Sequence, residues 1–373
     1  MVIQSNKERD TVLPFGRFTH SEIFHQPELW PATLEIVRQS GWTDQTDGRP
    51  VVITGAGTSA YAAAAIAESW PNAVAIPTTD LLIESRAELE RRSPHFSDSG
   101  LLISLARSGD SPESLAVVKR LMRLSPAVEH LAITCNAEGQ LAKTHGVIPI
   151  ILDPRTNDRS LAMTSSFSNL VLAGLCLRHR PEIEKILSAL CTTIQQRLPH
   201  LESEAERLSL GKVDRAVVLA SGALRPLATE TSLKILEMTA GRTATLCETF
   251  LGLRHGPMSF LNTNSLVLCF LSSSPQTRRY EEDLVSELRQ KQLGRIVGIA
   301  PHDADRSLFD HWIPASAPGC PDQLRVPFEI PFAQLLAYHL SLRQGLDPDN
   351  PSPMGAITRV VKNFEIYDQP AEV

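Results

Sequence analysis

The hydrophobic positions of this chain come in short apolar runs separated by longer amphipathic stretches. Several runs end in a turn of small or hydroxyl-bearing residues, after which helical periodicity begins. Short apolar runs suit strands that are buried on both faces, and their alternation with helices is typical of a mostly parallel sheet covered by helices. The pattern predicts strands at Val51–Thr54, Leu102–Leu105, Leu131–Thr134, Val217–Ala220, Val267–Phe270 and Ile296–Ile299.

The last three predicted strands repeat the first three at a constant offset of about 165 residues, which indicates an internal duplication. With 373 residues, the chain also exceeds the size at which a single core usually stops growing. We therefore expect two α/β domains in tandem, each a flavodoxin-like three-layer sandwich. The expected division is an N-terminal extension at 1–32, a first domain at 33–205, a second at 206–345 and a C-terminal tail at 346–373. The start of the tail is too rich in proline for a helix.

The stretch 101–114 is an apolar run that breaks into a hydroxyl-rich turn and then starts a helix. Gly109 allows a tight turn, and Ser111 followed by Pro112 is typical of a helix start, with serine as the cap. Backbone N–H groups at such a start, together with the hydroxyls of Ser108 and Ser111, suit a phosphate. Taken alone, the same residues also fit an ordinary capped loop.

Two further segments support the phosphate interpretation. A second strand, turn and helix start lies at 51–60, and a third hydroxyl cluster lies at 160–166. The glycines at 55–60 also fit the pattern G-x-G-x-x-A, with Asp80 farther along, so a nicotinamide-dependent dehydrogenase is an alternative. A dehydrogenase would explain neither the serine-rich loop at 108–111 nor the duplication.

Composition and charge narrow the class of partner. The net charge of −6 argues against nucleic acid and against a polybasic membrane surface. The N-terminus lacks an apolar signal core and no run approaches the roughly 20 residues that span a membrane, so a cytoplasmic location is expected. The six cysteines are scattered without a C-x-x-C pair, which favours reduced thiols over a zinc site or disulfides.

Taken together, these segments resemble the sugar isomerase (SIS) family, whose members bind phosphosugars, and the resemblance covers nearly the whole chain. Its markers are the segments 57–59, 108–111, 233–237, 253–257 and 334–339. The stretches 105–109, 156–167 and 350–353 look most like the branch of galactosamine-6-phosphate deaminases and tagatose-6-phosphate aldose-ketose isomerases. The resemblance implies two tandem SIS domains and a hexose or hexosamine 6-phosphate as the substrate.

The resemblance also implies which residues hold the phosphate. Ser59, Ser108 and Ser111 would bind it, in loops that include Gly57, Thr58, Ala106 and Arg107. Ala106 and Arg107 would line their loop through the backbone, and the Arg107 guanidinium either joins them or is solvated at the surface. Family members contact sugar hydroxyls near Ala162 and Met163, so Thr164 and Ser165 are further candidate contacts.

Isomerisation needs a base that moves a proton between C1 and C2. By the resemblance this base is Glu237, on a helix predicted at 224–240, where mostly apolar surroundings would raise its pKa. His255, exposed by the following glycine and proline, would open the sugar ring and reach the neighbouring subunit's site, which implies a homodimer with shared sites. Glu248 either orients His255 or binds nearby backbone. His339 fits a packed structural role on an amphipathic helix.

Arg359 stands where the synthase of this family has a lysine that forms a Schiff base, and a guanidinium does not form that imine under ordinary conditions. The chain also lacks a glutamine-hydrolysing domain, which favours release of ammonia or plain isomerisation. No metal or redox cofactor is expected, and the tail is expected to cross the active site. A non-catalytic phosphosugar sensor is the alternative, because one fold can serve both roles. The residues before the fold are too few for the DNA-binding module that such regulators usually carry.

Overall fold

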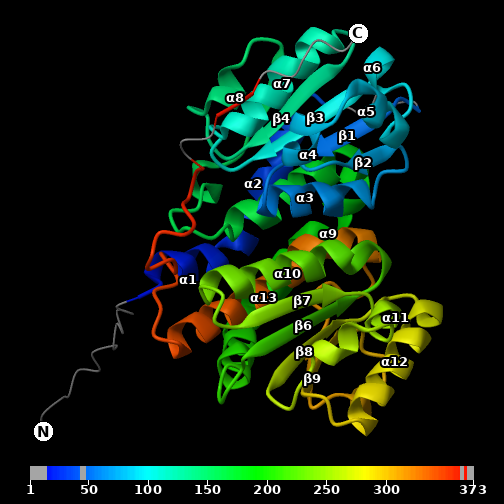
Figure 1. Ribbon diagram of the computed structural model, residues 1–373, viewed down its shortest axis with the longest axis vertical. Helices are drawn as coiled ribbons and strands as arrows, with labels where there is room; N and C mark the ends of the chain where they lie inside the picture. The colour runs from blue at the N-terminus through cyan, green and yellow to red at the C-terminus, as the bar shows by residue number, and fades with distance from the viewer. Residues whose placement is uncertain (1–14, 43–47, 362–364, 368–373) are drawn as a thin grey trace, which may run out of the picture.

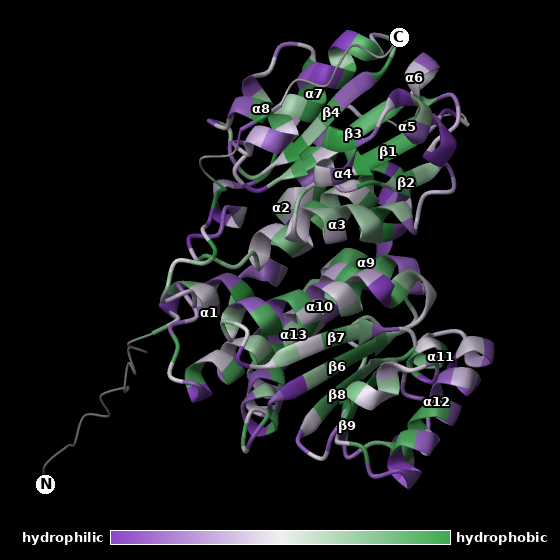
Figure 2. Cartoon of the chain, viewed as in Figure 1, coloured by the Kyte–Doolittle hydropathy of each residue, from purple (hydrophilic) through white to green (hydrophobic). Residues whose placement is uncertain are grey.

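The structure is a computed structural model that describes residues 15–42, 48–361 and 365–367, with two parallel sheets on either side of a shared layer of helices (Figure 1). The predicted N-terminal extension lies partly outside the described residues, and so does the end of the predicted tail. The predicted apolar runs are confirmed as buried strands, and β1 and β3 are among the green, hydrophobic parts of the ribbon (Figure 2).

The first sheet has the strand order β2-β1-β3-β4-β5, and every neighbouring pair is parallel. All three strands predicted in this half are confirmed as β1, β3 and β4. The edge strands β2 and β5 were not predicted: β2 has only three residues, β5 contains Pro149, and both are partly exposed. The bounds are β1 Val51–Thr54, β2 Ala73–Ala75, β3 Leu101–Ala106, β4 Glu129–Thr134 and β5 Val147–Ile151.

The second sheet has the order β10-β9-β8-β6-β7 and is also parallel throughout. The predicted strands are again the central ones, β6, β8 and β9, and the two sheets have corresponding strand orders, while the internal duplication itself stays a prediction. The bounds are β6 Arg215–Ala220, β7 Ala244–Glu248, β8 Ser265–Phe270, β9 Arg295–Ala300 and β10 His311–Pro314.

The helices form an inner layer and two outer layers. The inner helices are α1 Arg17–Phe24, α2 Gln26–Gln39, α3 Thr58–Ala67, α9 Ser165–Leu208, α10 Arg225–Met238 and α13 Asp322–Arg343. One outer layer covers the first sheet and consists of α4 Thr78–Ile83, α5 Arg86–Arg92, α6 Phe96–Ser99, α7 Pro112–Leu124 and α8 Gln140–Lys143. The second sheet's outer face is covered by α11 Phe250–Leu253 and α12 Pro275–Gln290.

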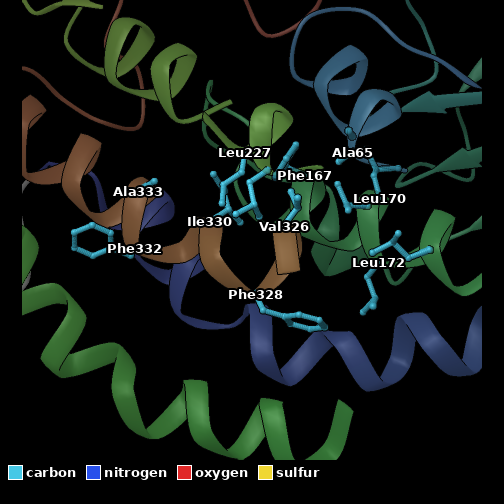
Figure 3. Close-up of a cluster of buried hydrophobic side chains, with 14 of the residues drawn as sticks. Ala65, Phe167, Leu170, Leu172, Leu227, Val326, Phe328, Ile330, Phe332 and Ala333 are labelled. Carbon is cyan, nitrogen blue, oxygen red and sulfur yellow. The ribbon is translucent and has the colours of Figure 1, made fainter. Parts of the chain in front are cut away.

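One hydrophobic core spans the inner layer and joins the two halves. It contains Ile53 from the first sheet and Val218 from the second. Between them pack apolar side chains of α3, α9, α10 and α13, such as Phe167, Leu227 and Val326 (Figure 3). The two halves therefore share their inner helices, so neither sandwich buries its core alone.

The expected domain boundaries fall within this inner layer. Residue 205 lies near the end of α9, and the boundary at 32 lies inside α2. The second part of α9 begins after a kink at non-helical His179. Pro181 follows that kink, where a missing N–H costs little.

The proline-rich tail begins as a loop and ties the N-terminal helix to the rest of the molecule. Oδ1 of Asp347 accepts from the N–H of Gly16 at 2.8 Å. Asp349 accepts the N–H groups of Phe18 and Thr19 at 3.0 and 2.7 Å, and so caps α1. The tail therefore wraps around the first half instead of leaving it.

Candidate active site

Three charged side chains lie together on one face of α10, because Glu230, Lys234 and Glu237 are spaced by four and three residues. Nζ of Lys234 lies 2.6 Å from Oε2 of Glu237 and 3.4 Å from Oε1 of Glu230. The side chains of Glu230 and Lys234 are 0% exposed, whereas that of Glu237 is 22% exposed. Oε1 of Glu237 has no hydrogen-bond partner among the described residues, which leaves this oxygen for a substrate.

Thr58 connects this cluster to the first half of the chain. Its hydroxyl accepts from Nζ of Lys234 at 3.0 Å and lies 3.4 Å from Oε1 of Glu230. Thr58 is the first residue of α3 and follows Gly57 directly, so the packing of α3 on α10 brings the loop after β1 to the cluster. The structure therefore unites the predicted loop at 57–59 with Glu237.

The charges of this cluster support one another. Burial raises the pKa of Glu230 to about 8, in spite of the neighbouring ammonium of Lys234. Burial by itself would lower the pKa of Lys234, but the carboxylates of Glu230 and Glu237 outweigh it and the pKa lies above its ordinary value. The expectation of apolar surroundings for Glu237 is wrong, because its carboxylate is paired with a buried cation.

Glycines shape the loop after β1. Gly57 has φ +57°, a conformation that side-chain-bearing residues rarely adopt, and it stands immediately before α3. A Cβ at Gly55 would approach the backbone of Ser59 to 2.6 Å, so only glycine lets this turn close. Ser59 is buried in the first turn of α3, at the end of the loop expected to hold phosphate.

The second predicted phosphate loop lies between β3 and α7, with Gly109 at φ +71°. The side chain of Asn136 donates to the carbonyl of Ser108 at 2.9 Å and holds the loop in place. Ser111 occupies the N-cap position of α7 as predicted, but its side chain makes no capping bond there. Its hydroxyl instead donates to Glu113 at 2.5 Å, so phosphate binding would require this serine to rotate.

His255 lies away from Glu237 within the chain. It is exposed in the turn between α11 and Pro257, and its ring makes no hydrogen bond or ion pair with any residue in the described part of the chain. The α11 segment packs on α12, on the outer face of the second sheet, whereas α10 covers the inner face. Glu248 accepts from the N–H of Thr249 at 2.7 Å, which confirms the backbone alternative for this carboxylate.

Comparison with known proteins places the chain in a family. A protein of Shewanella sp. (strain ANA-3), named D-galactosamine-6-phosphate deaminase AgaS, is 34% identical over 380 residues, which cover 95% of this chain and 92% of the relative. The chain belongs to the SIS family. Its branch is that of the galactosamine-6-phosphate deaminases and tagatose-6-phosphate ketose/aldose isomerases, as the resemblance of the sequence implies. No family model matches the chain.

Two further comparisons agree with this membership. The D-galactosamine-6-phosphate deaminase AgaS of Escherichia coli O157:H7 is 33% identical, over 94% of this chain and 96% of the relative. The crystal structure of the tagatose-6-phosphate ketose/aldose isomerase from Escherichia coli superposes with a TM-score of 0.80 and 32% identity, covering 91% of this chain and 96% of that one. The SIS architecture of two α/β halves is thus shown for the full length of the fold.

Arg107 of this SIS chain is buried, which is neither of the two environments that the sequence left open. Its guanidinium donates to the carbonyls of Ser160 and Leu161 at 3.2 and 3.0 Å, and to the carbonyl of Arg359 at 2.9 Å. Burial lowers the pKa of Arg107. The residue joins the phosphate loop to the segment before α9 and to the tail. Ala106, the last residue of β3, is buried beside it.

Arg359 holds the tail of this SIS chain in place through its side chain. Its Nε donates to the carbonyl of Asp158 at 3.0 Å, and its guanidinium donates to Oδ1 of Asn157 at 2.6 Å. Together with the bond from Arg107, these contacts press the tail against the hydroxyl-rich segment. The position expected to carry imine chemistry in the synthase therefore makes anchoring contacts here.

The segment at 158–166 is organised around a carboxylate that sequence reasoning missed. Asp158 is buried and accepts from the backbone N–H and the hydroxyl of Thr164, at 2.9 and 3.1 Å, and from the N–H of Ser165 at 2.9 Å. Asp158 thereby satisfies the free N–H groups at the start of α9. Thr164 is fully buried, Ala162 is buried and Met163 is half-buried. Of the three, only Met163 is partly open to solvent.

The sequence analysis also did not identify three other residues of the site: Glu230, Glu113 and Lys234, the ion-pair partner of Glu237. Lys234 stands within a quoted family marker, and the i, i+4 and i, i+3 spacing of charged residues on a helix was the signal that could have found the cluster. His339 packs as expected, with Nε2 3.7 Å from Oε1 of Glu202. Within the described residues, no group of His, Cys, Asp and Glu side chains is placed to hold a metal, and no helix has the length and apolarity needed to cross a membrane.

Proposed function

We propose that this SIS-family enzyme converts an amino-sugar 6-phosphate, galactosamine 6-phosphate in the first instance, into a ketose 6-phosphate and ammonium. The observation that carries the proposal is the arrangement of Glu237, which has one carboxylate oxygen on a buried ammonium and the other without a partner. The names of its relatives as deaminases and as a ketose/aldose isomerase support it.

The phosphate would bind at the loops after β1 and β3. Ser59, Ser108 and Ser111 supply hydroxyls, and the starts of α3 and α7 supply backbone N–H groups and the positive ends of their dipoles. The hydroxyl of Ser111 leaves Glu113 to reach the phosphate. When the phosphate is bound there, Glu237 of α10 lies on the side of the site where Lys234 donates to Thr58.

Proton transfer follows from the free oxygen of Glu237. Oε1 removes the C2 proton of the open-chain aldose, and the electron pair forms an enolamine. Return of the proton to C1 leaves an imine at C2, which water hydrolyses to the ketose and ammonium. Lys234 positions the carboxylate of Glu237 through the 2.6 Å bond to Oε2, and Glu230 positions Lys234 through a second ion pair.

Ring opening is assigned to His255 of the partner subunit. The exposed imidazole has no partner among the described residues of its own chain, and it lies on the other face of the second sheet from Glu237. In a homodimer, His255 of each subunit would enter the active site of its partner and contact the substrate there. The tail anchored by Arg359 closes the site on the side of Arg107.

The free cysteines fit action in the reducing cytoplasm. The substrates are small phosphosugars, with no nucleic acid and no membrane among the partners. Arg359 donates to backbone and Lys234 is buried in ion pairs, so neither residue is placed to form an imine with a ketose. Borohydride added with substrate should leave no covalent adduct on the protein.

The decisive experiment is a panel of hexose and hexosamine 6-phosphates assayed for both ketose and ammonium. Release of one ammonium per ketose from galactosamine 6-phosphate supports the proposal, with Glu237→Gln as the inactive control. Ketose formed from neutral hexose 6-phosphates, with no ammonium from any amino sugar, would replace deamination by aldose-ketose isomerisation.

A further inference from the structure

The loop that follows β8 in the second half corresponds to the phosphate loop after β3 in the first. The segment 272–275 precedes α12 as 108–112 precedes α7, and each has proline at the first helical position. In the second half, however, the hydrogen-bond donors of the loop are already bound to carboxylates of the chain. The N–H of Ser272 donates to Oε2 of Glu281 at 2.8 Å, and its hydroxyl donates to Oδ2 of Asp322 at 2.5 Å.

Asp322 takes the place that an anion would have in this loop. The N–H of Ser273 donates to both oxygens of its carboxylate, at 3.0 and 3.1 Å, and Arg325 donates to Oδ1 at 2.7 Å. Because the chain supplies its own anion here, the second loop has no free place for a phosphate.

The surrounding charges exclude an anion as well. Arg278 is paired with Asp303 at 2.6 Å, and Arg325 is paired with Glu329 at 3.3 Å. The carboxylates around the loop outnumber these two guanidiniums; they belong to Glu281, Glu282, Asp303, Asp322 and Glu329. The net negative surroundings favour a cation or a neutral ligand.

A pocket of about 280 Å³ lies beside the loop, where β6 and β7 end. Ligands of open α/β sheets bind at this end of the strands. The pocket combines apolar side chains, Leu251 and Tyr280, with polar side chains of Ser221, Gln276 and Thr277. Leu251 and Tyr280 are 43% and 59% exposed, and an apolar surface of this kind suits the face of a sugar ring.

Glu281 also lines this pocket and lacks a partner for one oxygen. The residue is 1% exposed, and its buried Oε1 makes no hydrogen bond of good geometry among the described residues, where Ser221 of the same pocket is the side-chain donor close to the carboxylate. Burial raises the pKa of Glu281 to about 7. A buried carboxylate oxygen without a donor is costly, and an ammonium or hydroxyl group of a ligand would satisfy it.

We propose that this pocket is a second sugar site, which binds an unphosphorylated amino sugar with its ammonium on Glu281 and its ring on Tyr280 and Leu251. Within one chain the site is separate from Glu237, because it lies by α11 and α12 on the outer face of the second sheet, whereas Glu237 lies on the inner face. Its occupation therefore does not depend on turnover, and the inference stands apart from the proposed function.

Isothermal titration of galactosamine and glucosamine into the full-length protein tests this inference. The active site is first saturated with a hexitol 6-phosphate, which has no ring to open. Binding at millimolar concentration is expected to persist under that condition. It should weaken at least about tenfold in Tyr280→Ala and in Glu281→Gln, and remain unchanged in Glu282→Gln, whose side chain does not line the pocket.

The choice of sugars sharpens the result. N-acetylated hexosamines, which lack the ammonium, should bind at least about fivefold more weakly, and inorganic phosphate should not compete. Absence of binding would overturn the proposal, as would displacement of the amino sugar by the hexitol 6-phosphate. Unchanged affinity in Tyr280→Ala, an exposed position whose truncation leaves the core intact, would overturn it even if Glu281→Gln failed to fold.

Discussion

Lys234 donates to Oε2 of Glu237 at 2.6 Å, and this bond gives the face of α10 its chemical character. The ammonium is fully buried, and its other partners in the described part of the chain are Thr58 and Glu230. A buried cation held from three sides keeps one oxygen of Glu237 in place. In the proposed function, the other oxygen exchanges a proton with the substrate.

Glu237→Gln should lower kcat at least about a hundredfold, because an amide cannot accept the C2 proton. Binding of a hexitol 6-phosphate, measured by titration calorimetry, should survive, since the phosphate loops are untouched. Glu248→Gln is the matched control, because that carboxylate accepts from its own neighbouring backbone. Near-normal turnover in Glu237→Gln would remove this residue from the mechanism.

Lys234→Met should cost stability as well as activity. It leaves Glu230 buried without its cation, and breaking a buried pair in this way costs up to about 3–5 kcal/mol, less where Glu230, whose pKa burial raises to about 8, takes up a proton. Urea denaturation should show the loss, and the double variant Glu230→Gln/Lys234→Met should recover part of it. If the single variant is as stable as the wild type, the pair does not hold α10 in place.

Mixed dimers test the shared site. Subunits carrying Glu237→Gln and subunits carrying His255→Ala are each expected to be inactive. When they are mixed, some sites receive an intact glutamate and an intact histidine from different chains, so activity should return. A mixture that stays inactive, although native mass spectrometry shows heterodimers, would contradict the contribution of His255 from the partner subunit.

Glu22 should make stability depend on pH. Its carboxylate accepts from the N–H of Arg159 at 2.5 Å, and burial, together with the charge of Asp158, raises its pKa from 4.5 to about 7. Between these values the folded state binds more protons than the unfolded state. The stability that this group contributes is therefore fully present below pH 4.5 and is lost as the pH rises through 7.

The variant Glu22→Gln isolates that contribution. Urea denaturation between pH 4.5 and 7.5 should show that the wild type loses stability relative to the variant, at up to about 1.4 kcal/mol per pH unit. Parallel curves for the two proteins would mean that Glu22 titrates in the folded state as it does in the unfolded state.

The site was only partly predictable from the sequence. Glycine, serine and proline at the end of a strand predict the loops at 57–59 and 108–111, because turns and helix caps depend on local sequence. Arg107 shows the limit. An arginine next to a phosphate loop reads as a ligand or as a surface group, yet this side chain binds three carbonyls, one of them in the tail. Contacts between residues so far apart leave no local pattern.

By itself, the sequence determined the alternation of strands and helices and the family, because each depends on short-range periodicity or on motifs, whereas the duplication and the phosphate loops stay predictions from the same signals. The tertiary structure alone decided which charges meet. It set Lys234 against Thr58, merged the inner helices into one core, and placed His255 and Glu237 on opposite faces of one sheet. Packing between distant segments sets these relations, since burial decides whether a charged group needs a partner and topology decides which partner it finds.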